Sequence, residues 1–216
     1  MKLKENSSLL FIGDSVTDCG RARPFAEGHY GQLGSGYPAI IQSLLDAYFP
    51  ALNLRILNTG VSGDDVLRLK SRWLTDALEL RPTYISIMIG INDVWHQFDS
   101  PRTPQRVIKL DTYTATLEEL ITSSLKSGVE KVILITPFYI EPNVNDNVRN
   151  MLDQYGKAVK ALATKHNCIL VDAQSAFDEA CKYYHSSFYS ADRVHPNLTG
   201  HTIIAKAFLE AIGADK

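Results

Sequence analysis

The sequence predicts a three-layer α/β/α sandwich, doubly wound around a parallel sheet. Apolar runs of strand length alternate along the chain with longer stretches of helical period, which is typical of repeated βα units. The short runs are apolar throughout, as expected of strands buried on both faces, so helices must cover both sides of the sheet. Right-handed crossovers then leave few topologies. We expect one domain over residues 1–216, with five parallel strands. The order of the strands cannot be read from the sequence, and we take 2-1-3-4-5 as a hypothesis.

The expected elements follow from the apolar pattern. Strands are expected at residues 8–13, 54–58, 84–89, 131–136 and 168–172. Helical patterns occupy residues 38–48, 65–80, 105–127, 146–166 and 199–212. In the last of these, Ile204 and Phe208 recur at helical spacing and give the helix one apolar stripe for the sheet. Gly128 directly follows the long central helix, as glycine often does at a helix end.

Composition and charge exclude several classes of protein. A formal net charge of −2, without a cluster of Lys or Arg, gives no basic surface for nucleic acid. The N-terminus is polar and the apolar run after it is too short for a signal peptide or a membrane span, so we expect a cytoplasmic protein without a membrane partner. The three cysteines lack disulfide or zinc-ligand spacing, which predicts free thiols and no metal site.

Four segments place functional residues where the carboxyl edge of the sheet is expected, the edge at which such folds bind ligands. They are Gly-Asp-Ser at 13–15, a glycine-rich stretch at 58–63, Gly-Ile-Asn-Asp at 90–93, and Asp-Arg-Val-His-Pro at 192–196. Each has an ordinary interpretation when taken alone, as a turn, a helix cap or a surface ion pair. Their occurrence at one edge instead favours an active site.

Ser15 is the candidate nucleophile, and a serine hydroxyl needs a base that takes its proton. Asp192 precedes His195 by three residues, so its carboxylate can reach Nδ1 and leave Nε2 free to accept that proton. Asp172 ends a strand and is a rival orienting residue, but we expect it to cap the following segment. The backbone N–H groups of Ser15 and Gly60 and the amide of Asn92 are the expected oxyanion donors.

These motifs resemble those of the SGNH hydrolases in the GDSL esterase group, over nearly the whole chain. The resemblance implies a flavodoxin-like sandwich and a serine esterase. The stretches at residues 14–24, 86–95 and 136–141 further resemble intracellular acetylxylan esterases. That resemblance implies removal of O-acetyl groups from xylo-oligosaccharides by a homo-oligomeric enzyme.

The expected chemistry is acyl transfer through an acetyl-serine, which needs no cofactor or metal because the triad activates its own nucleophile. Asp14, Trp95 and Tyr139 are the candidate substrate contacts, and Phe138 could join the two aromatic residues in lining the mouth of the site. Asp14 is also expected to organise its loop through backbone hydrogen bonds.

Two alternatives to the acetylesterase remain open. The chain could be a broad small-acyl esterase, thioesterase or lysophospholipase on the same scaffold. It could instead be a catalytically silent carbohydrate-binding or scaffolding protein. The sequence has no Gly-x-Ser-x-Gly motif, and its first βα turn carries a serine where a dinucleotide-binding motif needs glycines.

Overall fold

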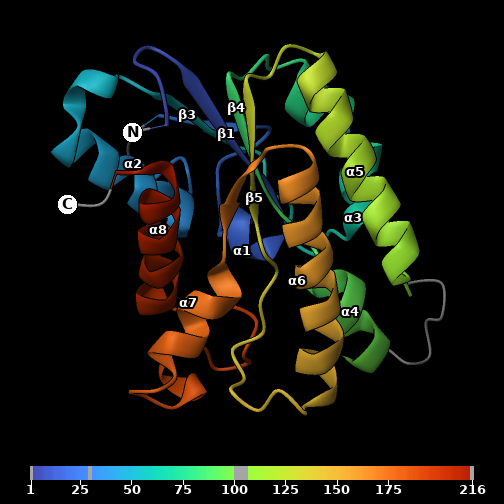
Figure 1. Ribbon diagram of the computed structural model, residues 1–216. Coiled ribbons are helices and arrows are strands. Elements are labelled where there is room, and N and C mark those ends of the chain that lie inside the picture. Colours follow the sequence, from blue (N-terminus) through green and yellow to red (C-terminus); the bar gives the residue numbers. More distant parts are fainter. Residues whose placement is uncertain (1, 29–30, 100–106, 215–216) are drawn as a thin grey trace.

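The computed structural model describes residues 2–28, 31–99 and 107–214, and Figure 1 shows a central sheet with helices on both sides. Within this part of the chain the sheet has six strands in the order β2-β3-β1-β4-β5-β6. Their bounds are Ser8–Gly13 (β1), Ala26–Glu27 (β2), Arg55–Asn58 (β3), Tyr84–Met88 (β4), Lys131–Ile135 (β5) and Ile169–Val171 (β6).

The five predicted strands are parallel and have the predicted order, since β3, β1, β4, β5 and β6 are neighbours in that sequence. The predicted total of five strands is wrong, because β2 adds an antiparallel edge strand. It pairs Ala26 with Asn58 and Glu27 with Leu57. A strand of only two residues has no alternating pattern that sequence analysis could detect.

Two groups of helices cover the two faces of the sheet (Figure 1). One face packs against α2 (Tyr37–Tyr48), α7 (Ala173–Ala180) and α8 (Leu198–Ile212). The other packs against α3 (Val66–Ser71), α4 (Ile91–Asp99), α5 (Leu110–Lys126) and α6 (Asn147–Lys165). A single turn of helix, α1 (Ser15–Asp18), follows β1. Among the described helices, none is long and apolar enough to cross a lipid bilayer.

Each helical stretch expected from the sequence contains a helix, with two differences in extent. The stretch at 65–80 is interrupted, because α3 ends at Ser71 and a π-helical segment, Leu74–Leu78, follows. The expected start of the central helix, at residue 105, lies outside the described residues, and α5 begins at Leu110. The short helices α1, α4 and α7 had no expected counterpart, because they are too short for a convincing apolar stripe.

The central strand β1 is fixed from both faces. Leu9 and Phe11 belong to one apolar cluster, and Leu10 and Ile12 belong to the other, because side chains alternate along a strand. The Phe11 ring lies 5.4 Å from the ring of Phe208 on α8. Burying each of these side chains stabilises the fold by about 1.5–3 kcal/mol. The segment that follows β1 therefore starts from a rigid support.

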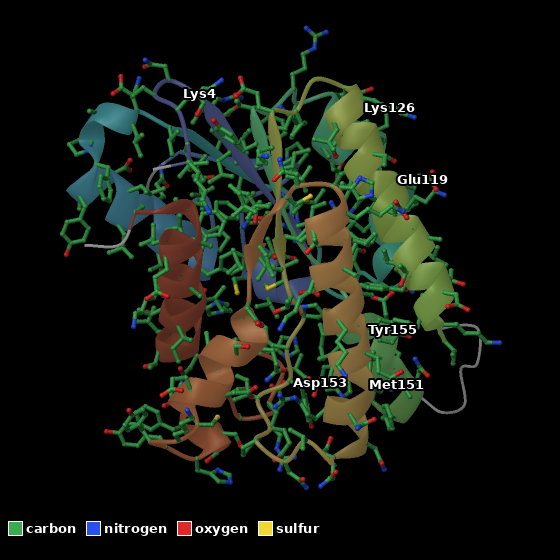
Figure 2. All side chains as sticks on the ribbon, in the orientation of Figure 1. Lys4, Glu119, Lys126, Met151, Asp153 and Tyr155 are labelled. Carbon is green, nitrogen blue, oxygen red and sulfur yellow. The ribbon has the colours of Figure 1, made fainter. Side chains whose placement is uncertain are left out.

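The opposite layer is joined by polar as well as apolar contacts. Tyr155, labelled on α6 in Figure 2, lies with its ring 4.8 Å from that of Tyr113 on α5. Its hydroxyl donates to the carbonyl of Ile108 at 2.5 Å, so a buried phenol has an acceptor. The Tyr113 hydroxyl donates to the Ile89 carbonyl at 2.9 Å, which joins this layer to the carboxyl end of β4.

Candidate active site

Ser15 is the first residue of α1 and directly follows the turn that ends β1. The Asp14 carboxylate caps this helix by accepting the Val16 N–H at 3.0 Å. Gly13 is needed for the turn, because a Cβ there would lie 2.2 Å from the carbonyl oxygen of Met88 on β4. A larger residue would push Ser15 away from the edge of the sheet.

Ser15, His195 and Asp192 form a connected chain of hydrogen bonds. The Ser15 Oγ lies 2.9 Å from His195 Nε2, although the two residues are 180 positions apart in the sequence. The His195 Nδ1 lies 2.6 Å from the Asp192 Oδ2. Because an ionised carboxylate only accepts hydrogen bonds, Nδ1 carries the proton and Nε2 is left to accept one from the serine.

The Asp192 carboxylate is held by its own turn. Its Oδ1 accepts the N–H groups of Val194 and His195 at 2.9 and 2.8 Å and the Ser190 hydroxyl at 2.9 Å. Partial burial alone would raise the pKa of Asp192, but the hydrogen bonds from His195, Val194 and Ser190 bring this pKa down to about 2. Asp192 therefore stays ionised at neutral pH and keeps the imidazole in one orientation.

Three candidate hydrogen-bond donors lie on the segments that follow β1, β3 and β4. The backbone N–H groups of Ser15 and Gly63 have no hydrogen-bond acceptor among the described residues. The Asn92 amide donates one hydrogen to the Asp64 carbonyl at 2.8 Å, and its second hydrogen remains for a ligand. Gly63 has a φ of +82°, a conformation that favours glycine.

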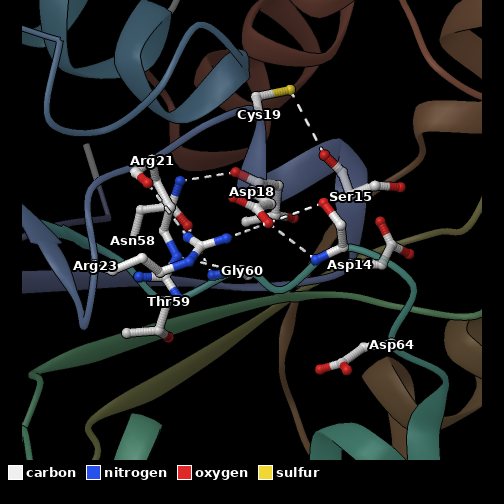
Figure 3. A network of polar contacts seen from close by, with 12 residues as sticks. Asp14, Ser15, Asp18, Cys19, Arg21, Arg23, Asn58, Thr59, Gly60 and Asp64 are labelled. Carbon is white, nitrogen blue, oxygen red and sulfur yellow. Dashed lines mark hydrogen bonds and ion pairs between the residues drawn. The ribbon is translucent and has the colours of Figure 1, made fainter.

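The expectation that Gly60 is an oxyanion donor conflicts with this geometry. The Gly60 N–H donates to the Asn58 side-chain oxygen at 2.9 Å, and the Gly60 carbonyl accepts from Arg21 at 2.6 Å, in the network that Figure 3 shows. A Cβ at this position would lie 2.5 Å from the Asp18 backbone nitrogen. Gly60 therefore allows close packing, and Gly63 replaces it as a candidate donor. Residue type and spacing do not distinguish the two glycines.

Of the aromatic residues expected at the mouth, Trp95 lies at the triad. Its ring centroid is 5.8 Å from that of His195. Tyr139 is half-buried, and its backbone N–H and C=O both bond to the Gln174 side chain. Phe138 is instead buried in the core, with its ring 4.6 Å from Phe177, so it is not available to line the mouth.

Asp14 does not fit the expected role of substrate contact. Its side chain is buried beneath α1 and only 1% of the residue is exposed, so it has almost no surface to offer a ligand. The expected organisation of the loop by its carboxylate is confirmed by the hydrogen bond to Val16. Burial raises the pKa of Asp14 to about 7.

Asp172 caps a helix, as expected, and is not part of the triad. It accepts the Ser175 N–H at the start of α7 and forms an ion pair with Lys160. Asp93 is a buried acid that sequence analysis did not single out, and burial raises its pKa to about 8. No signal in the sequence marks this aspartate as buried, because its neighbours are polar as well as apolar.

The structure gives no cluster of three or more His, Cys, Asp or Glu side chains able to hold a metal ion within the described part of the chain. Cys19, Cys168 and Cys181 are free thiols, as predicted. The Cys19 sulfur lies 3.2 Å from His201 Nε2, one helical turn from the candidate nucleophile.

Comparison with known proteins agrees with this arrangement. Residues 11–203 match the GDSL-like lipase/acylhydrolase family. The chain belongs to that family. An acetylxylan esterase from Geobacillus stearothermophilus is 49% identical over 99% of this chain and 97% of that protein.

The crystal structure of the Geobacillus enzyme, covering 99% of this chain and 97% of its own, superposes with a TM-score of 0.97. Variants of that enzyme described as catalytic mutants replace a serine, a histidine or an aspartate with alanine. LAE5, described as an alpha/beta hydrolase enzyme from the metagenome of Lake Arreo in Spain, is 44% identical. Its crystal structure covers 100% of this chain and 99% of its own, with a TM-score of 0.97.

Proposed function

We propose that this protein is a serine esterase that removes O-acetyl groups from acetylated xylo-oligosaccharides. Ser15 is the nucleophile, His195 the general base and Asp192 the residue that orients it. The observation that carries this proposal is the continuous chain from the Ser15 Oγ to His195, at 2.9 Å, and on to Asp192, at 2.6 Å. The similarity to an acetylxylan esterase over nearly the whole chain supports the substrate class.

In the proposed first step, Ser15 Oγ attacks the acetyl carbonyl carbon while its proton passes to His195 Nε2. The carbonyl oxygen becomes an oxyanion. The bond to the sugar oxygen then breaks, and this oxygen takes the proton from Nε2 and leaves as a free hydroxyl. Water repeats the sequence on acetyl-Ser15, so that acetate leaves and the serine hydroxyl is restored.

The oxyanion would be stabilised by the N–H groups of Ser15 and Gly63 and by the Asn92 amide. Two of these groups lack an acceptor in the described structure, and the third has one hydrogen to spare. Donors that are already in position need no reorganisation when the charge develops, and the loss of one such donor costs about 3 kcal/mol.

The surroundings of the triad suit a substrate with a bulky sugar. An apolar hollow of about 10 Å³ is lined by Asp14, Val16, Ile89, Phe138 and Val194, and the side chains of Ser15 and His195 do not line it. The His195 side chain is 46% exposed, which leaves the triad open to a bulky sugar, and Trp95 beside it offers a ring face.

A substrate panel tests the proposal. Acetylated xylo-oligosaccharides, aryl acetates, octanoyl esters and acyl-CoA are compared by kcat/KM, with Ser15→Ala as the inactive variant and Ser43→Ala on α2 as its matched control. Preference for acetylated xylose is expected. A flat profile would favour the broad small-acyl esterase instead. Full activity of Ser15→Ala would contradict the proposed mechanism, in which Ser15 is the nucleophile.

Covalent labelling of Ser15 by an organophosphonate separates an enzyme from a silent carbohydrate-binding protein. The triad predicts rapid labelling that mass spectrometry locates at Ser15 and that Ser15→Ala abolishes. An unlabelled, folded protein without esterase activity would favour the scaffolding alternative.

We further propose that the protein is a cytoplasmic homo-oligomer. Large exposed side chains support a contact between copies, because Tyr183 is 75% and Leu198 69% exposed, and Tyr184 and Phe188 stack at the surface with ring centroids 4.6 Å apart. Light scattering coupled to size-exclusion chromatography measures the mass of the particle. A mass equal to that of one chain would contradict the oligomer.

A further inference from the structure

Arg72 is a largely buried arginine whose side chain reaches the edge of the sheet that holds the candidate active site. It is the C-cap residue of α3, at the point where the predicted continuous helix is interrupted. Its side chain is only 15% exposed. A guanidinium in this position is stabilised only where carbonyl or carboxylate oxygens receive its hydrogen bonds.

The Arg72 guanidinium donates hydrogen bonds to oxygen atoms of two different segments of the chain. Its Nη2 donates to the Gly13 carbonyl at 3.1 Å and its Nη1 donates to the Thr59 carbonyl at 2.6 Å. Its Nε donates to the Asp64 carboxylate at 2.6 Å, and Nη1 also reaches the Asp76 carboxylate at 3.0 Å. The side chain thus joins the end of β1 to the whole loop after β3.

Two of these contacts, those with Gly13 and Asp64, lie close in the sequence to a candidate oxyanion donor. Gly13 is two residues before Ser15, and Asp64 directly follows Gly63. The carbonyl of Asp64 also accepts the Asn92 amide at 2.8 Å, which connects this loop to the start of α4. In Figure 3, Asp64 lies below Asp14, whereas Thr59 lies on the other side of the view, beneath Arg23.

We propose that Arg72 is a positioning residue for the oxyanion site. It fixes the two loops relative to each other, so that the Ser15 N–H, the Gly63 N–H and the Asn92 amide converge on one point. The inference rests on the proposed esterase function. The three nitrogens of the Arg72 guanidinium each bind a different oxygen, whereas lysine has a single nitrogen to carry its donors, so lysine replaces arginine poorly here.

This role predicts a specific kinetic signature. The donors act on the oxyanion, which exists only in the transition state and the tetrahedral intermediate, so their displacement lowers kcat and leaves KM nearly unchanged. Misplacement of a group by about 1 Å can cost about 100-fold in rate. We expect Arg72→Met to lower kcat by about 100-fold and Arg72→Lys by about tenfold, both with KM within about threefold.

The experiment measures kcat, KM and the rate at which a fluorophosphonate labels Ser15, whose transition state also carries charge on an oxygen in this site. Lys70→Met is the control, because Lys70 lies on the same helix but its ammonium pairs with Glu119, labelled on α5 in Figure 2. Lys70→Met should leave both rates unchanged. Circular dichroism and thermal unfolding show which variants are folded at the assay temperature.

Double variants with Asn92→Ala distinguish positioning from general loss of structure. If Arg72 acts through the oxyanion donors, the combined loss in Arg72→Met with Asn92→Ala falls short of the product of the single losses by about tenfold or more. If Arg72→Met does not fold, Arg72→Lys is used in the same cycle.

The outcomes separate this inference from the function on which it rests. Wild-type kcat in Arg72→Lys, a change confined to KM, or losses that multiply fully in the double variant would overturn the role of Arg72 alone. A wild-type protein that neither hydrolyses esters nor reacts with the fluorophosphonate would overturn both proposals.

Discussion

Replacing Asp192 with asparagine changes one atom and should nearly abolish the proposed activity. The Asp192 Oδ1 accepts two backbone N–H groups and the Ser190 hydroxyl, so the amide oxygen of an asparagine must occupy that place. The new NH₂ group then faces His195 Nδ1, which has to accept a hydrogen bond. The imidazole proton is thereby forced onto Nε2, where it blocks proton transfer from Ser15.

The expected loss of kcat can be worked out from the hydrogen bonds that must break before His195 can adopt the productive tautomer. Turning the amide over sacrifices the three hydrogen bonds at Oδ1, at about 1 kcal/mol each. Loss of the negative charge beside the imidazolium adds about 2 kcal/mol. The sum of about 5 kcal/mol corresponds to a loss of between three and four powers of ten in kcat.

Steady-state hydrolysis of an aryl acetate at neutral pH measures this loss. The control is Ser190→Ala, which removes one hydrogen bond to Oδ1 but leaves the contact with Nδ1, and which should retain kcat within about fivefold. A folded Asp192→Asn variant with more than a tenth of wild-type kcat would refute the assignment of the tautomer.

Four further substitutions test other parts of the protein. Asn92→Ala should lower kcat by about 100- to 1,000-fold with little change in KM, and an effect on KM alone would assign the amide to substrate binding instead. Gly60→Ala should lower the free energy of unfolding in urea by about 2 kcal/mol, because the new Cβ would lie 2.5 Å from the Asp18 backbone nitrogen. Gly63→Ala should lower it by about 1 kcal/mol, because a Cβ there meets no atom within 4 Å but the φ of +82° is strained for alanine. Equal stability of Gly60→Ala and wild type would contradict the packing role of Gly60. Burial raises the pKa of Asp93 from 3.8 to about 8, so the folded state keeps a proton that the unfolded chain has lost, and stability should fall as pH rises between these values. In Asp93→Asn, the free energy of unfolding should decrease less between pH 5 and pH 8 than it does in the wild type. An unchanged decrease would contradict the raised pKa of Asp93.

The parallel strands and the triad were accessible from the sequence because their signals are local. Each long strand is a continuous apolar run, and Asp192 and His195 lie within one turn. Ser15 was recognisable from its place directly after a strand. These features need only the chain's own neighbours along the sequence, which is why their positions were predicted without knowledge of the packing.

The errors concern residues whose surroundings come from distant parts of the chain. Gly60 and Gly63 both look like loop glycines, and only the approach of Asp18 and Asn58 shows that the first is closed off. Among the three aromatic candidates for the mouth, only the packing against Phe177 shows that Phe138 belongs to the core.

The sequence by itself determined the positions of the five parallel strands, the residue types of the triad and the edge of the sheet on which they lie, because apolar periodicity and turn chemistry are short-range properties. The order of the strands in the sheet depends on long-range packing. The tertiary structure alone decided which N–H groups are unpaired, which aromatic rings are buried and what Arg72 binds. Hydrogen-bond pairing and burial depend on contacts between segments such as residues 13, 59, 64 and 72, which meet only when the helices pack on the sheet.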